Sequence, residues 1–127
     1  MTVSHILAVL SSSDLVIEVK VIAMNVEPKT QSLRAKATLK KGYELYVNEG
    51  MSENYRRYSY HLQKGDKMIR RWDNAPHWRA IRTFPFHLHI PDKDKPIECE
   101  EVFVSDVLRE IRNIIGEEKE GDKTLSR

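Results

Sequence analysis

The sequence predicts an α+β domain in which an antiparallel β-meander of five to six strands packs against a short N-terminal helix and a C-terminal helix. Three observations predict this fold class. Residues 33–40 alternate between apolar and polar side chains, which is typical of a strand with one buried face. Residues 41–42 and 64–66 are glycine-containing turn sequences between extended segments. Residues 107–115 repeat apolar side chains at helical spacing.

The first half of the chain predicts one helix and three strands. Apolar residues at helical spacing within residues 3–10 predict a short helix that the serines at 11–13 end. Residues 15–24 are typical of a strand, and residues 33–40 and 43–47 are predicted to form a hairpin across the first turn. The predicted shared faces are Ile17, Val19, Val21 and Ala23 in the first strand and Leu33, Ala35, Ala37 and Leu39 in the second.

The second half predicts further strands separated by one irregular loop. Residues 55–63 and 67–72 alternate across the second turn and predict another hairpin. Pro76 disfavours regular structure in the residue before it, so a loop is expected there. A short strand is predicted over residues 85–90, and a further extended stretch follows the charged loop 91–96.

The last predicted element is the strongest helix. Ser105 is a suitable N-cap and Gly116 a suitable C-cap. The apolar stripe between them consists of Val107, Leu108, Ile111, Ile114 and Ile115. We therefore expect a single domain over residues 1–116, followed by a charged, flexible tail over residues 117–127.

Composition limits the class of protein. The chain has 127 residues, of which 40% are hydrophobic and 31% charged, as in globular proteins with a solvated surface. No apolar stretch is long enough to span a membrane, and we expect no signal peptide. The single cysteine, Cys99, excludes an internal disulfide framework and a zinc site of several cysteines. These features favour a cytoplasmic protein.

Residues 70–90 hold the greatest concentration of reactive side chains. Three of the five histidines lie there, and two of them form the H-x-H pair His87 and His89. Because side chains alternate along a strand, these two imidazoles should point to one face, and we expect that face to be turned outward. Residues 64–82 contain six basic residues against two acidic ones, although the net charge of the chain is only +2. A basic patch beside histidines suggests an anionic partner, and a solvated strand face is the alternative.

Three chemistries are compatible with these histidines. Paired imidazoles cleave RNA without a metal when one accepts the 2′-hydroxyl proton and the other protonates the departing 5′-oxygen. An arginine or lysine then stabilises the charge that develops on the phosphorus. Alternatively, His87 and His89 bind a metal, with His77 as a third ligand and Asp73 as a fourth. The third possibility is that the histidines only cap loops or bond to backbone.

Other residues of the segment have two possible roles each. Asp73 either builds a turn or orients a histidine, and it is able to do both. Arg70 and Arg71 should point to opposite faces, so only one of them is expected at a site. Cys99 lies among glutamates that raise its thiol pKa, which makes it a poor nucleophile. The candidate substrate contacts are Asn74, Arg70, Tyr60 and His61.

The segments R-W-D-N-A-P-H (residues 71–77) and T-F-P-F-H-L-H (residues 83–89) resemble the signature of the TumE family, the toxins of prokaryotic type II toxin–antitoxin pairs. The resemblance covers about residues 14–115 and is specific between Arg70 and Ile90. The positions that match are Arg71, Asp73, Asn74, Pro76, His77, Thr83, Pro85, His87 and His89. The chain departs from the signature at Trp78, Phe86 and Leu88, where the family pattern has polar side chains.

The resemblance implies a small toxin that attacks RNA or blocks translation and is neutralised by a DNA-binding helix-turn-helix antitoxin. The prediction is a metal-independent endoribonuclease that needs no cofactor. Its acid, base or phosphate contacts are His77, His87 and His89, with Arg71 on the scissile phosphate and Asp73 orienting a histidine. The alternatives are a non-enzymatic module that binds RNA or protein, and a metal-dependent hydrolase using the H-x-H pair. An unpaired edge strand also allows a homodimer. Since both paired imidazoles are expected outside the core, His87→Ala and His89→Ala should leave the fold intact.

Overall fold

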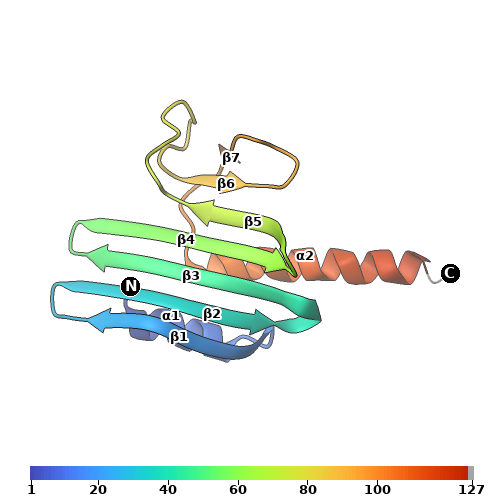
Figure 1. The fold of residues 1–127 in the computed structure, drawn as a ribbon, viewed down its shortest axis with the longest axis horizontal. Helices are drawn as coiled ribbons and strands as arrows, with labels where there is room; N and C mark the ends of the chain where they lie inside the picture. Colours follow the sequence, from blue (N-terminus) through green and yellow to red (C-terminus); the bar gives the residue numbers. More distant parts are fainter. Residues whose placement is uncertain (126–127) are drawn as a thin grey trace.

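The computed structural model describes the backbone of residues 1–125 and the side chains of residues 1–116. Seven antiparallel strands form one sheet in the consecutive order β1 to β7, and two helices lie against the same face of it (Figure 1). The α+β class and the meander are thus confirmed. The seventh strand is the extended stretch after the charged loop, which forms only two residues of strand. The elements are α1 (Val3–Ser12), β1 (Val16–Val26), β2 (Thr30–Leu39), the 3₁₀ turn η1 (Lys40–Gly42), β3 (Tyr43–Ser52), β4 (Tyr55–Lys64), β5 (Lys67–Asp73), β6 (His87–His89), β7 (Ile97–Glu98) and α2 (Val104–Leu125).

The tight turns form where the glycines predicted them. Lys41 and Gly42 both adopt positive φ between β2 and β3, and Gly65 does so between β4 and β5. Glycine adopts this backbone conformation without the steric cost that a β-carbon brings. These two turns set the register within the β2–β3 and β4–β5 pairs, and a third short turn after Ser52 joins β3 to β4.

The helix ends differ from the prediction. Helix α2 begins at Val104, and the Asp106 carboxylate accepts a hydrogen bond of 2.8 Å from the Phe103 backbone N–H. Ser105 therefore lies inside the first turn and is not the N-cap. The prediction of Gly116 as C-cap is also wrong, because the helical backbone continues to Leu125. The flexibility predicted for residues 117–127 stays a prediction, since their side chains lie outside the described residues.

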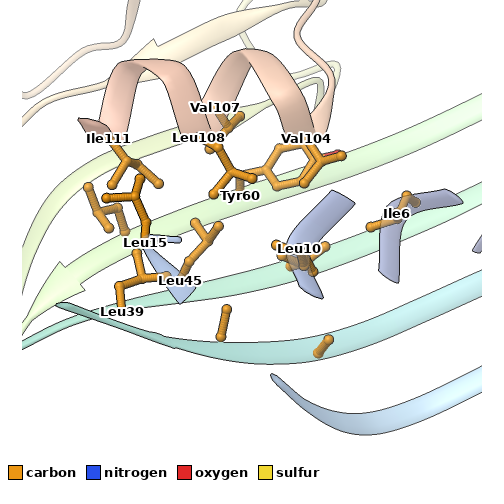
Figure 2. Packing of buried hydrophobic residues seen from close by; sticks show 14 of the residues in the cluster. Ile6, Leu10, Leu15, Leu39, Leu45, Tyr60, Val104, Val107, Leu108 and Ile111 are labelled. Carbon is orange, nitrogen blue, oxygen red and sulfur yellow. The ribbon is translucent and has the colours of Figure 1, made fainter. Parts of the chain in front are cut away.

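The core lies between the sheet and the two helices. Side chains of α2 such as Val107 and Ile111 pack with Leu45 and Tyr60 from the sheet (Figure 2). Helix α1, with Ile6 and Leu10, packs against β1 and β2. All of these side chains are buried. The alternate apolar residues predicted for β2 are buried as expected, and Trp72 on β5 is buried as well. The helices therefore cover one sheet face, and we call the opposite one the open face.

The face predicted for β1 is only partly correct. Register shifts occur between Val16 and Glu18 and between Val21 and Ala23, so the alternation of side chains restarts twice along the strand. As a result, Val19 and Val21 lie opposite the core residues of β2, whereas Ala23 lies opposite exposed Arg34. β1 is also an edge strand, and it leaves several large apolar side chains exposed: Ile17, Val21, Ile22, Met24 and Val26. Among the described residues, no helix is long and apolar enough to cross a membrane.

Candidate functional site

The strand register gathers the predicted site residues into two cross-strand rows on the open face. In the first row, Arg71 of β5 lies between His61 of β4 and His89 of β6. In the second row, Asp73 lies between Ser59 and His87. Residues directly opposite each other in antiparallel strands share a face, so both rows project away from the helices. The prediction that His87 and His89 share a face is confirmed.

Asp73 is the centre of this cluster. Its Oδ2 accepts a hydrogen bond of 3.0 Å from Arg71 Nε, and its Oδ1 accepts one of 2.9 Å from the Ala75 backbone N–H. Oδ1 also lies 2.8 Å from His87 Nε2, and Oδ2 lies 3.6 Å from His89 Nε2. The carboxylate therefore both builds the turn at the end of β5 and holds the basic groups, as the sequence allowed.

His87 is buried beneath the loop between β5 and β6, with only 2% of its side chain exposed. Its Nδ1 lies 2.9 Å from the Pro85 carbonyl oxygen, so this ring nitrogen carries the proton and donates. Its Nε2 lies 2.8 Å from Asp73 Oδ1, but the geometry is not that of an aligned hydrogen bond, and Nε2 has no other hydrogen-bond partner among the described residues. The expectation that both imidazoles face outward is wrong for His87, because its ring is buried against Pro85 of the preceding loop and against Asp73.

His89 is the accessible imidazole of the pair, with 25% of its side chain exposed. Burial lowers the pKa of His89 below its ordinary value, and the charges of His87 and Arg71 lower it further, while Asp73 opposes this shift. The rings of Trp78 and His87 each meet the His89 ring edge-on, with centroids 6.4 and 4.9 Å away. His89 is thus held in place, neutral and open to the solvent.

Arg71 supplies an available cation beside His89. Its side chain is 42% exposed, and its Nε is bound to Asp73. Its terminal nitrogens form no hydrogen bond or ion pair with another described residue. Arg70 points to the other face, where it lies opposite buried Leu62 and lines a hollow with Trp72. The predicted separation of the two arginines is confirmed, and Arg71 is the one at the cluster.

The loop from residue 74 to residue 86 borders the cluster and is anchored at both ends. The Asn74 side chain accepts a hydrogen bond from the Tyr58 N–H and donates one to the Arg56 carbonyl, at 2.9 and 2.8 Å. The Thr83 hydroxyl donates to the Phe86 carbonyl and accepts from the Cys99 N–H, at 2.7 and 3.0 Å. His77 lies on this loop with an exposed side chain. No described contact joins His77 to Asp73.

Three predicted substrate contacts are occupied by other partners. Asn74 is buried, and its side-chain amide forms hydrogen bonds with the β4 backbone. Tyr60 is buried on the helix side, where its hydroxyl donates to the Glu49 carboxylate and burial raises its pKa. The His61 Nε2 lies 3.2 Å from the side-chain amide oxygen of Gln63. Burial lowers the pKa of His61, and the charge of Arg71 lowers it further.

The cluster also has the composition of a metal site. Asp73, His87 and His89 each offer one ligand atom, and these atoms lie within 4.8 Å of one another. The His87 Nδ1–H bond to a carbonyl oxygen is a common support of a metal-binding imidazole. His77, the predicted third ligand, is not part of this group. Nitrogen and oxygen ligands of this kind suit zinc and related divalent metals.

Sequence reasoning missed the residues of β2, β3 and β4 that extend the open face next to this cluster. Arg34, Asn48 and Ser59 continue the row of Asp73, and each is paired to the next by register. Strand alternation puts Arg34 on the face opposite the predicted apolar face of its strand. Only the register of three successive strand pairs, β2–β3, β3–β4 and β4–β5, placed it in line with Asp73.

The comparisons with known proteins give one match. A family model described as Toxin TumE matches residues 6–116. No curated protein and no solved structure matches the chain.

Proposed function

Because this chain belongs to the TumE toxin family, we propose that it is the toxin of a type II toxin–antitoxin pair and that it cleaves RNA without a metal ion. One observation carries the proposal: a single carboxylate, that of Asp73, holds Arg71 and lies beside His89 on the open face. In acid–base cleavage of a phosphodiester, an oriented imidazole transfers a proton and a neighbouring guanidinium stabilises the developing negative charge. In this proposal the compartment is the cytoplasm and the partner is a helix-turn-helix antitoxin. A homodimer stays a prediction.

The lowered pKa of His89 suits it to act as the general base, because a base must be neutral before it accepts a proton. His89 takes the proton of the 2′-hydroxyl, and the 2′-oxygen then bonds to phosphorus. The bond from phosphorus to the 5′-oxygen breaks, and a general acid protonates that oxygen. The products are a 2′,3′-cyclic phosphate and a 5′-hydroxyl. Arg71 stabilises the negative charge that gathers on the phosphoryl oxygens.

We assign the general acid to His77 by comparing the other histidines. His87 is buried between Pro85 and Asp73, and His5 lies on α1 in the helix layer. The Nε2 of His61 faces Gln63, and its Nδ1 is buried. His77 is exposed, and its neighbour Trp78 contacts the ring of His89. The loop therefore carries His77 at the border of the cluster.

Cleavage should survive chelation of metal ions. We expect purified protein to cleave total RNA equally with and without EDTA and to leave 2′,3′-cyclic phosphate ends, which are detected by end-specific ligation. The group formed by Asp73, His87 and His89 supports metal-dependent hydrolysis as a second candidate. Activity that is lost in EDTA and restored by zinc or manganese would favour that candidate. An intact RNA sample in every lane would favour a non-enzymatic binding module.

The pH profile should show His89 acting as a base. The rate falls when the base is protonated, so kcat/KM should decrease as the pH drops through the pKa of His89. Burial, Arg71 and His87 lower that pKa and Asp73 opposes them, so the acid limb should lie below about pH 6.5, the ordinary histidine value. The measurement is kcat/KM on a short single-stranded RNA across pH at constant ionic strength. An acid limb well above that value would contradict the assignment.

A further inference from the structure

A hollow on the open face adjoins the proposed reaction centre. It has a volume of about 400 Å³ and includes Arg71 and Asp73 in its lining. From there it extends across β4 and β3 to Arg34 on β2. We call it the arginine hollow. Cavities of this size lie within the usual range for small-ligand sites, roughly 300–1,000 Å³.

The arginine hollow carries positive charge that the protein itself does not neutralise. Besides Arg71, its lining includes Arg34 and Arg57. Arg34 donates a hydrogen bond of 3.2 Å to the Asn48 side-chain oxygen, and neither Arg34 nor Arg57 forms an ion pair with a described residue. Two acids line the hollow, and each already binds another arginine: Asp73 binds Arg71, and buried Glu49 binds Arg56. An anionic ligand therefore fits this surface.

The hollow also has an aromatic wall and an open floor. Tyr55, at the start of β4, is 58% exposed, which is unusual for a large aromatic side chain in this sheet. Gly50 lies opposite Arg57 in the register, and a β-carbon built on Gly50 would meet no atom within 4 Å. Bases of single-stranded nucleic acids stack on exposed aromatic rings beside cationic grooves. The surface thus combines a stacking platform with phosphate-binding groups.

We propose that the arginine hollow binds one unpaired nucleotide next to the scissile phosphate, so that the substrate is single-stranded RNA. The base stacks on Tyr55, Arg57 and Arg34 bind the adjacent phosphate, and Arg71 is shared with the reaction centre. A duplex keeps its bases stacked inside and is recognised by shape over a long surface, which a hollow of this size does not offer. The proposal rests on the proposed RNA cleavage and adds the substrate class and a nucleotide subsite.

Binding is tested in EDTA with a short single-stranded 2′-O-methyl RNA, which lacks the nucleophilic hydroxyl and cannot undergo the proposed cleavage. Fluorescence anisotropy should show that Tyr55→Ala weakens binding by about tenfold or more. Arg57→Gln should also weaken binding and reduce its dependence on salt. Gly50→Val should block the hollow without unfolding the protein, because the site has room and its φ is not positive. The matched control is Arg109→Gln on α2, in the helix layer, which should bind like the wild type.

Two results would overturn the subsite. One is wild-type affinity in both Tyr55→Ala and Gly50→Val, and the other is equal affinity of the wild type for the single strand and for its duplex. Cleavage of unmodified RNA by the same preparations separates this inference from the proposed function. If the wild type cleaves RNA but the variants bind normally, only the subsite is wrong. If binding depends on Tyr55 and Gly50 but no RNA is cleaved, the subsite holds and the catalytic proposal fails.

Discussion

His89→Ala lowers the rate of RNA cleavage by about 10²–10⁴-fold and leaves the protein folded, if His89 is the general base. The imidazole is partly exposed and its Nε2 is 3.6 Å from Asp73, which is too far for a direct hydrogen bond, so its removal leaves no buried group without a partner. The measurement is the single-turnover cleavage rate of a short RNA, together with growth of cells that express the variant.

The control for this experiment is His5→Ala. His5 is an exposed histidine on α1, in the helix layer, so the same chemical change there should leave the cleavage rate unchanged. His77→Ala, which removes the proposed general acid, should cause a loss of the same order as His89→Ala. If His89→Ala cleaves RNA at the wild-type rate, the imidazole is not the base and the proposed mechanism fails.

His87→Ala destabilises the protein, in contrast to His89→Ala. We expect the free energy of unfolding to fall by about 2–4 kcal/mol, from the cavity that replaces a buried ring and from the polar groups that lose a partner. Those groups are the Pro85 carbonyl, which loses a hydrogen bond from Nδ1, and the buried Asp73 carboxylate, which loses a 2.8 Å contact with Nε2 that is not an aligned hydrogen bond. Asp73 retains Arg71 and the Ala75 N–H, so the loss is smaller than for a buried charge left wholly unpaired.

Urea denaturation followed by tryptophan fluorescence measures this difference, because Trp72 is buried next to the cluster and is exposed on unfolding. His89→Ala serves as the comparison and should change the unfolding free energy by less than about 1 kcal/mol. Equal stability of the two variants would show that the contacts of His87 with Pro85 and Asp73 do not hold the loop. In that case His87 would again be a candidate for the general acid or the general base.

The two variants show where sequence reasoning reached its limit. Alternation correctly put His87 and His89 on one strand face, because the side-chain period of a strand is local and needs only the backbone. It could not distinguish a covered imidazole from an open one. That difference depends on the loop from residue 74 to residue 86, whose path is set by the anchors at Asn74 and Thr83.

The same contrast holds for the fold. Glycine turns and the apolar stripe of α2 are local signals, and they predicted the hairpins and the final helix correctly. The two register shifts of β1 had no local signal, because every residue of that strand is compatible with extended backbone. Gly116 resembled a helix end but lies within α2, because a glycine cost of about 1 kcal/mol does not end a helix by itself.

The sequence by itself determined the α+β class, the order of the elements, the family signature and the set of groups available for chemistry. Only the tertiary structure decided that Asp73 joins Arg71, His87 and His89, and that Arg34 and Arg57 face the same hollow as Arg71. The physical reason is the range of the interactions. Periodicity and turns act over a few neighbouring residues, whereas burial and cross-strand contact depend on segments that the chain brings together only when it folds.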